Sequence, residues 1–283
     1  MKYLITGAAG MLGRDLQKAL TGRDVTALSR ADLDVTDPDA VRAAVDGHDV
    51  VINAAAYTRV DDAETHEDEA YAINATGAGN LARAAATARA VLVQLSTDYV
   101  FDGAATTPYR EDAALNPVSA YGRTKADGER LVRELNPRRS LIIRTAWLYG
   151  AHGPNFAKTM LRLAAAHETV SVVTDQVGQP TWTLDLARQI VALLDEGATS
   201  GIYNGTASGE ASWYDFAREI FRLSGLDPDR VRPTDSAQFV RPAPRPAYSV
   251  LGHDAWGLLG LESMRDWRVA LEDAAAQGVL NHE

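Results

Sequence analysis

The sequence predicts an α/β fold, in which a doubly wound parallel sheet with helices on both faces is followed by a smaller mixed α/β lobe. Through residue 150, short β-branched runs alternate with longer alanine-rich stretches of helical character. Such alternation is typical of a parallel sheet that is covered on both sides. The runs at 50–52 and 91–95 are almost entirely apolar, as expected of strands buried on both faces. After Gly150 the alternation loosens, which indicates a second unit.

The individual elements follow from the same patterns. In the first half we expect strands at 2–6, 25–29, 50–54, 91–96 and 141–145, and helices at 11–20, 38–45, 64–88 and 119–135. Asp37 followed by Pro38 is a good helix start, because aspartate caps free amides and proline suits the first helical position. In the second half we expect helices at 155–167, 184–194 and 213–223, and strands at 169–174 and 201–204. The proline-rich stretch from Arg232 to Pro246 cannot be regular for long.

Composition and charge narrow the class of protein. A hydrophobic fraction of 46% argues against disorder. Asp and Glu number 38 against 28 Lys and Arg, a net charge of −10, so we expect no nucleic-acid or anionic-membrane surface. The absence of cysteine excludes disulfides and thiolate chemistry. The N-terminus lacks signal-peptide features, and no stretch approaches the roughly 20 apolar residues of a membrane span. We therefore expect a cytoplasmic protein.

A glycine turn, GAAGMLG at 7–13, lies between the first expected strand and the first helix. Its glycines are spaced three apart, unlike the G-x-G-x-x-G fingerprint. Small residues there still allow the backbone to approach a pyrophosphate, and the helix amides favour its negative charge. A plain turn would also use glycine, but the βαβ context favours nucleotide binding. The sequence thus predicts a Rossmann-type dinucleotide-binding domain over 1–150. A mainly substrate-binding lobe is expected over 151–283, with some segments returning to the main domain.

Specificity for the ribose of the cofactor is set at the end of the second strand, where an acidic residue would bind the 2′-hydroxyl of NAD. Here the strand ends Leu28-Ser29-Arg30, and the first carboxylate is that of Asp32. The guanidinium of Arg30 has the fork of donors that pairs with a 2′-phosphate. We therefore expect NADPH as the preferred cofactor, with NADH as the alternative if Arg30 is merely solvated.

Tyr121 and Lys125 stand four residues apart on an expected helix, which places both side chains on one face. A phenol is a weak acid at neutral pH, and a neighbouring ammonium is expected to lower its pKa. Thr97 ends the fourth strand, at the edge where open α/β sheets carry their chemistry. Its hydroxyl can hold a carbonyl oxygen beside the phenol. Together Thr97, Tyr121 and Lys125 predict a site that protonates an oxygen while a nicotinamide delivers hydride to the carbon.

With these residues in place, the chain resembles the extended short-chain dehydrogenase/reductases and, among them, the dTDP-4-dehydrorhamnose reductases. The resemblance runs over essentially the whole chain. Its carriers are ITGAAGMLG at 5–13, NAAAYTRVDDAE at 53–64, STDYVFDG at 96–103, NPVSAYGRTK at 116–125, RTAWLYG at 144–150, DQVGQPT at 175–181 and RPAYSVL at 245–251. The glycine turn and the Tyr–Lys pair are shared by all extended members. More particular to the rhamnose branch are the segments around Thr58–Glu64, Asp98–Gly103, Trp147 and Gln176–Thr181.

The resemblance implies a role for each matching residue. The pyrophosphate is lined by Gly7, Gly10, Met11 and Leu12, and the adenosine half of the cofactor by Arg30, Asp34 and Val35. Further cofactor contacts are implied for Ala55, Ala56, Tyr57 and Thr58. Tyr121 and Lys125 also hold the nicotinamide ribose. The sugar is touched by Thr97 and Asp98, with Trp147 as an apolar wall. Position 57 is often histidine in the family, so Tyr57 is a departure.

The implied reaction is NAD(P)H-dependent reduction of the 4-keto group of dTDP-4-dehydro-L-rhamnose to dTDP-L-rhamnose, with the proton from Tyr121. This reaction belongs to dTDP-rhamnose biosynthesis for cell-wall polysaccharide. Many relatives also use magnesium at a carboxylate-rich dimer contact. Those carboxylates are not identifiable in this sequence, so magnesium and a homodimer stay open and no metal ligand is assigned.

Other functions compete with this prediction. A nucleotide-sugar epimerase or dehydratase would use the same cofactor without net oxidation, although Tyr99 stands where a dehydratase would carry glutamate. A non-catalytic regulatory subunit of the methionine adenosyltransferase type is a third possibility, against which the intact Thr97, Tyr121 and Lys125 argue. Asp61, Asp62 and Glu64 are predicted to form a helix N-terminus, where the dipole favours carboxylates. Trp147 has simple core packing as its alternative.

Overall fold

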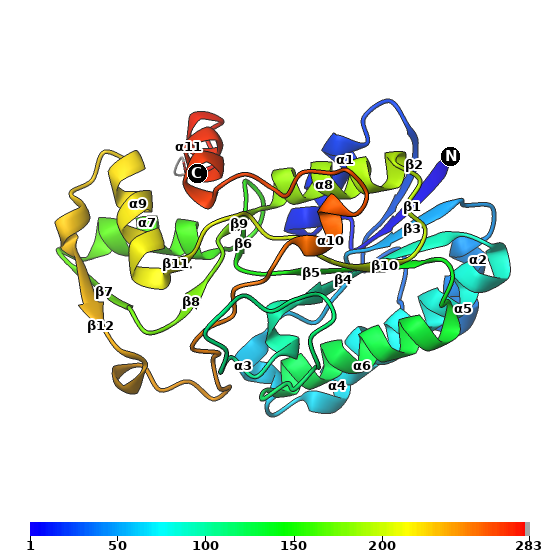
Figure 1. Cartoon of the computed structure of the whole chain (residues 1–283), viewed down its shortest axis with the longest axis horizontal. Helices are drawn as coiled ribbons and strands as arrows, with labels where there is room; N and C mark the ends of the chain where they lie inside the picture. Colours follow the sequence, from blue (N-terminus) through cyan, green and yellow to red (C-terminus); the bar gives the residue numbers. More distant parts are fainter. Residues whose placement is uncertain (281–283) are drawn as a thin grey trace.

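The computed structural model describes residues 1–280, and its centre is a six-stranded sheet in the order β10-β5-β4-β3-β1-β2 (Figure 1). All its strand pairs are parallel. The strands are β1 (Lys2–Thr6), β2 (Asp24–Leu28), β3 (Val50–Asn53), β4 (Val91–Thr97), β5 (Ser140–Thr145) and β10 (Gly201–Asn204). The predicted strands are confirmed to within one residue at each end, and so is the doubly wound α/β class.

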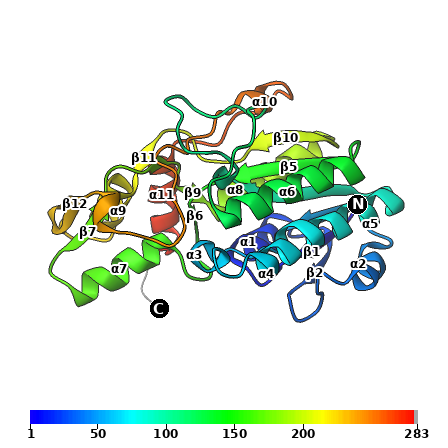
Figure 2. The ribbon, with the colours of Figure 1, turned by 90° about the horizontal axis from the view of Figure 1, so that it is seen from below.

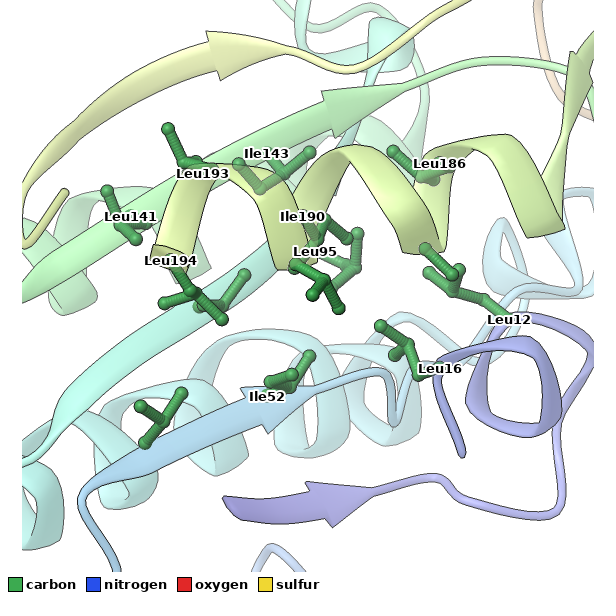
Figure 3. Packing of buried hydrophobic residues seen from close by; sticks show 14 of the residues in the cluster. Leu12, Leu16, Ile52, Leu95, Leu141, Ile143, Leu186, Ile190, Leu193 and Leu194 are labelled. Atoms are coloured by element: carbon green, nitrogen blue, oxygen red, sulfur yellow. The ribbon is translucent and has the colours of Figure 1, made fainter. Parts of the chain in front are cut away.

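Helices cover both faces of the sheet (Figures 1 and 2). One face carries α1 (Met11–Ala19) and α8 (Thr183–Asp195), and the other carries α2 (Pro38–Val45), α5 (Ala78–Ala88) and α6 (Ala120–Leu135). Leucines and isoleucines of α8 point onto β4 and β5, as Figure 3 shows for Ile190, Leu193 and Leu194. Each fully buried side chain of this size contributes about 1.5–3 kcal/mol. Helix α8, although late in the chain, is therefore part of the core of the main sheet.

The long helix expected at 64–88 is wrong in its detail. The structure has α3 (Val60–Ala63), α4 (Glu67–Tyr71), a π-helical turn at Ala72–Gly77 and then α5. The wider turn buries Asn74, whose side chain bonds both backbone groups of Tyr57, with the Tyr57 amide 2.9 Å from Asn74 Oδ1. Single π-helical turns of this kind are frequent at functional sites, and this one faces the end of β3.

A second unit with its own core lies to the left in Figure 1. It contains α7 (Phe156–Ala166), α9 (Trp213–Leu223) and the parallel pair β7 (Val170–Val173) and β12 (Val231–Thr234). Phe216, Ile220 and Phe221 of α9 are fully buried in it. A capping box between Ser212 and Asp215 begins α9. The stretch that we expected to be irregular thus opens with a short strand, which Pro233 tolerates because β12 pairs on one side only.

The helix α11 (Trp267–Ala276), which completes this second core, was not predicted. Short paired strands connect the two units: β6 (Leu148–Tyr149) with β9 (Thr181–Trp182), and β8 (Val177–Gly178) with β11 (Ala211–Ser212). The remaining short helix, α10 (Asp254–Gly257), packs beside β10. Among residues 1–280, no helix has the length and apolarity needed to span a membrane.

Candidate active site

The glycine turn between β1 and α1 lies where the strand order reverses, because β2 and β3 flank β1 on opposite sides. Gly7 has φ +67°, and a Cβ there would lie 2.5 Å from the backbone nitrogen of Ala55. A Cβ on Gly13 would lie 2.3 Å from the Gly7 carbonyl oxygen. Gly10 precedes α1 without a side-chain cap. The amides of the first helical turn are therefore left for an anionic ligand, as a pyrophosphate site requires.

A cavity of about 400 Å³ opens beside this turn. It contains seven of the predicted cofactor residues, namely Gly7, Gly10, Arg30, Asp34, Val35, Ala55 and Ala56. Residues that the sequence reasoning missed complete the lining: Ala9, Leu33, Thr36, Ala54, Glu69, Ala72 and Ile73. The last three come from α4 and the π-helical turn. They were not predicted, because the sequence pattern indicates one regular helix over 64–88.

The other six predicted cofactor residues lie outside this lining, namely Met11, Leu12, Tyr57, Thr58, Tyr121 and Lys125. The Leu12 side chain is buried in the core, and the Met11 sulfur lies 3.8 Å from Asn155 Nδ2, so both would meet a pyrophosphate through their backbone amides. Tyr57 is buried in a small cluster with Ala120 and Tyr121, and Thr58 is exposed. The structure thus places Tyr57 beside Tyr121 rather than in the lining of the first cavity.

The carboxylate nearest in sequence to the end of β2 is that of Asp32, and it already accepts hydrogen bonds from Ser29. Asp32 accepts from the backbone amide of Ser29 at 2.9 Å and from its hydroxyl at 2.6 Å. These bonds lower the pKa of Asp32. The exposed Arg30 lines the cavity. The Arg30 guanidinium can pair with a phosphate, so the cavity fits a dinucleotide, including one that carries a 2′-phosphate.

The predicted catalytic residues come together at the end of β4. Ser119 caps α6, accepting from the Gly122 amide at 3.1 Å, and so fixes the turn that carries Tyr121. Lys125 follows one helical turn later, is 4% exposed and donates to the carbonyl of Leu95 at 2.6 Å. Burial raises the pKa of the Tyr121 phenol to about 12, and the neighbouring Thr97 hydroxyl acts in the opposite direction.

The expectation that Lys125 lowers the pKa of Tyr121 is not met in this structure. Burial is the largest influence on the phenol, and the ammonium bonds the Leu95 carbonyl instead. Burial also lowers the pKa of Lys125 to about 8, although the Glu129 carboxylate opposes this change. Both side chains are thus protonated at neutral pH, which suits a group that must donate a proton.

Asp98 begins the turn that follows β4, and its side chain is 2% exposed. The Thr97 hydroxyl donates to its Oδ1 at 2.9 Å, while Oδ2 has no hydrogen-bond partner within residues 1–280. Burial raises the pKa of Asp98 to about 6, opposed by the nearby hydroxyl groups of Ser249 and Thr97. A buried carboxylate oxygen without a partner is costly. It marks a place where a ligand hydroxyl could bind.

A second cavity of about 390 Å³ lies beyond Tyr99, toward the second unit. Its lining is both aromatic and cationic: Asp61, Tyr99, Phe156, Thr159, Met160, Leu163, Ser171, Val172, Val173, Gln176, Trp213, Phe239, Arg241 and Arg245. Most of these residues were missed, because the lining comes from six separate segments of the chain. Guanidinium groups suit phosphates and aromatic rings suit a base, so the cavity fits a nucleoside diphosphate.

Asp61 and Glu64, which were predicted to form a helix N-terminus, also make contacts with distant segments of the chain. Asp61 does lie in the first turn of α3, but its carboxylate pairs with Arg245 at 2.9 Å and Arg241 at 3.8 Å. Glu64 Oε1 accepts from the Ala120 amide at the start of α6 at 2.8 Å. Both carboxylates therefore join α3 to segments far along the chain that line or carry the site.

Trp147 adopts φ +47°, a strained backbone conformation for a bulky residue. Its ring stacks on Trp213, with centroids 3.5 Å apart, and Trp213 lines the second cavity. A Cβ on Gly178 would lie 2.6 Å from the Trp147 ring, so the indole is held on both sides. Such strain is frequent where a side chain must be placed for a ligand.

The described residues do not form a recognisable magnesium site. Within residues 1–280 no group of three or more histidine, aspartate or glutamate side chains is arranged to hold a metal ion. The carboxylates Asp61 and Glu64 are instead engaged by arginine and by a backbone amide.

Comparison with known proteins agrees with this geometry. The family model described as RmlD substrate binding domain matches residues 1–279. The chain is 53% identical to dTDP-4-keto-6-deoxy-D-glucose reductase of Streptomyces niveus, covering 96% of both chains. It is 52% identical to dTDP-4-dehydrorhamnose reductase of Streptomyces griseus, covering 96% of this chain and 92% of that protein.

Solved structures give the same result. A dTDP-4-dehydrorhamnose reductase of Clostridium acetobutylicum superposes with a TM-score of 0.94 at 48% identity, over 98% of this chain and 99% of that one. That of Bacillus anthracis, in complex with NADP, gives 0.93 at 38% identity over 98% and 100%. The family predicted from the sequence motifs is confirmed: the chain belongs to the RmlD family, that of the dTDP-4-dehydrorhamnose reductases.

Proposed function

We propose that this chain catalyses the NAD(P)H-dependent reduction of the 4-keto group of a dTDP-4-keto-6-deoxy sugar, with dTDP-4-dehydro-L-rhamnose as substrate and dTDP-L-rhamnose as product. The observation that carries the proposal is the place of Tyr121. Its ring packs against the cluster formed by Tyr57, Ala63, Ala70 and Ala120, as does Ile73, which lines the first cavity. It also lies edge-on to Tyr99, which lines the second cavity, with centroids 5.6 Å apart. The phenol therefore lies where a cofactor and a nucleotide sugar would meet.

In this proposal each side chain of the site has a separate role in the reaction. A nicotinamide bound in the first cavity supplies hydride to the carbonyl carbon. Tyr121 gives its proton to the oxygen, which becomes an alkoxide far more basic than a phenol whose pKa is about 12. The Thr97 hydroxyl, beside the phenol at the end of β4, orients the ketone. Lys125 holds the nicotinamide ribose, and Asp98 accepts from a sugar hydroxyl through its free oxygen.

The second cavity recognises the nucleotide part of the substrate in this proposal. Arg241 and Arg245 bind the diphosphate, and the stacked Trp147 and Trp213 form the apolar wall. Residues 151–283 then act mainly as the substrate-binding lobe over the dinucleotide-binding domain of residues 1–150. The relatives named above act on different 4-keto sugars, so the same nucleotide pocket is compatible with more than one hexose.

The proposal is tested by following NADPH absorbance while enzymatically prepared dTDP-4-dehydrorhamnose is added, with Tyr121→Phe in parallel. We expect stoichiometric oxidation by the wild type and a loss in kcat of about 10²–10⁴-fold in the variant, since a general acid contributes that much. Unchanged NADPH affinity in the variant separates lost chemistry from lost binding. Tight cofactor binding without oxidation of NADPH or NADH would instead indicate an epimerase or a regulatory subunit.

A further inference from the structure

A buried ion pair lies directly behind the catalytic group. Glu129 on α6 and Arg144 on β5 are each 2% exposed and form a bidentate pair, with Nε–Oε1 2.9 Å and Nη2–Oε2 2.8 Å. Burying two charges carries a large desolvation cost, and well-packed apolar residues in such a place are often as stable or more so. Stability alone therefore explains this pair poorly.

The Glu129 carboxylate is tied to the two segments that carry the catalytic side chains. The hydroxyl of Ser96, next to Thr97 at the end of β4, donates to Glu129 Oε1 at 2.5 Å. Glu129 lies one turn from Lys125 on the same face of α6. Lys125 itself donates to the carbonyl of Leu95 on β4 at 2.6 Å. Helix α6 is thus fixed to β4 through the two residues that precede Thr97.

The guanidinium of Arg144 extends this connection to the chain that follows β4. Its Nη1 donates to the carbonyl of Glu111 at 2.9 Å. Its Cζ lies 5.1 Å from the ring centroid of Phe101, just after the turn that holds Asp98. In the sheet, Arg144 lies opposite Ser96 and Thr145 opposite Thr97. The segments that carry Thr97, Asp98, Tyr121 and Lys125 therefore meet at one buried pair.

We propose that Glu129 and Arg144 are positioning residues that hold α6 against the end of β4, so that Tyr121 and Lys125 keep their places beside Thr97. The inference rests on the catalytic roles proposed above. The carboxylate also favours the ammonium form of Lys125 against burial. The other ionisable groups around the site include Tyr121 on the same helix, Asp98 and Tyr99 on the turn after β4, and Arg144 on β5. Asp61 of α3 and Arg245 lie beside Tyr99.

The substitution Glu129→Gln tests this role, because it keeps the size of the side chain and an acceptor for Ser96 while removing the charge. We expect kcat to fall about tenfold or more from small misplacement, with a much smaller change in the KM for NADPH. The alkaline limb of kcat against pH should move to lower pH by roughly one pH unit, since Lys125 loses a neighbouring anion. A purely structural role would lower Tm without moving that limb.

A matched control is Asp185→Asn. Asp185 also forms an ion pair, half-buried, with Arg265 at 2.8 Å, but it contacts none of the catalytic side chains among residues 1–280. The control should leave kcat and its pH profile unchanged. A second variant, Glu129→Leu with Arg144→Met, replaces the pair by apolar side chains and should unfold cooperatively yet lose kcat. Should it fail to fold, Glu129→Gln decides; wild-type kcat and an unmoved alkaline limb in that variant would overturn the inference.

A binding measurement separates this inference from the proposed reaction. NADPH fluorescence titrations from about pH 6 to about pH 9 need no turnover. We expect the Kd of the wild type to rise above about pH 8, as the buried Lys125 loses its proton, and the rise in Glu129→Gln to begin at lower pH. If the pH dependence of the Kd shifts in this way but the wild type does not reduce the sugar, the positioning role is supported and the proposed reaction is rejected. Identical binding profiles would reject the positioning role whatever the sugar.

Discussion

At the scale of single residues, the site depends on charged and polar groups that are removed from water. Lys125 and Asp98 are both nearly inaccessible, and burial moves the pKa of each toward neutrality, to about 8 and about 6. Such shifts oppose folding and are typical of functional sites. Replacing a residue that is proposed to carry the chemistry is therefore expected to increase the stability of the protein.

Lys125→Met makes this expectation measurable. In the wild type the folded-state pKa of Lys125, about 8, lies below the ordinary value of 10.5. The unfolded chain therefore binds more protons between these values, and wild-type stability rises with pH over that window. At pH 7 the variant should be more stable by on the order of 1–3 kcal/mol. Urea unfolding at pH 7 and near pH 10 should show this gain shrinking; a constant difference would contradict it.

Arg30→Ala addresses cofactor choice. Charge-assisted hydrogen bonds contribute about 1.5–3 kcal/mol, so loss of the guanidinium should lower the preference for NADPH over NADH by about 10–100-fold. The ratio of kcat/KM for the two cofactors measures this change. Arg14→Ala, on the neighbouring exposed surface of α1, serves as the control. A variant of Arg30 that kept the wild-type ratio would show that this arginine is only solvated.

At the scale of elements, the turn between β1 and α1 requires glycine for two reasons, its positive φ and its contact with the chain after β3. Gly22, in the turn between α1 and β2, shares only the first: it has φ +86°, and a Cβ added there would meet no other part of residues 1–280 within 4 Å. The two glycines thus allow the effect of backbone conformation to be separated from that of close approach.

Gly7→Ala and Gly22→Ala form the corresponding pair of variants. Alanine in the left-handed region costs roughly 1–2 kcal/mol at either position. At Gly7 the Cβ also meets Ala54 and Ala55 at 2.5–2.6 Å, so the turn must open. We expect NADPH affinity to fall by about 100-fold or more only in Gly7→Ala. Equal cofactor affinity of the two variants, measured by fluorescence titration, would refute the close-approach argument.

At the scale of the whole molecule, the chain leaves the main sheet after β5, builds much of the second unit, and returns through α8 and β10. Residues 1–150 alone lack both returning elements. Leu95, Leu141 and Ile143, which α8 covers in Figure 3, would then face water.

A fragment of residues 1–150 is therefore expected to lack cooperative thermal unfolding and to bind a hydrophobic dye, because an apolar face and the edge of β5 are uncovered. Near-ultraviolet circular dichroism and dye fluorescence check this expectation. A fragment of residues 1–204, which contains α8 and β10, is the comparison. A sharp unfolding transition in the shorter fragment would contradict it.

The sequence predicts those features of the fold and of the site that are determined within a single segment of the chain. Strands such as 2–6 and the pair Tyr121 and Lys125 follow from periodicity within one segment, and the structure places them as expected. The second cavity does not, because Asp61, Trp213 and Arg245 meet only through tertiary packing. The pKa of Tyr121 also escaped prediction, since burial is not a local property. The π-helical turn was not predicted, because its apolar pattern is the same as that of a regular helix.

The late return of β10 has a consequence for the order in which the molecule can be completed during synthesis. The last residue of β5, Thr145, is followed by 55 residues before β10 begins at Gly201. At about 5–20 residues per second, the growing sheet waits roughly 3–11 s for its outermost strand and for the helix that covers it. During that interval an open strand edge is available to any neighbouring chain. A nascent-chain chaperone that shields this edge would thus be expected to raise the yield of native protein more than one that acts after release.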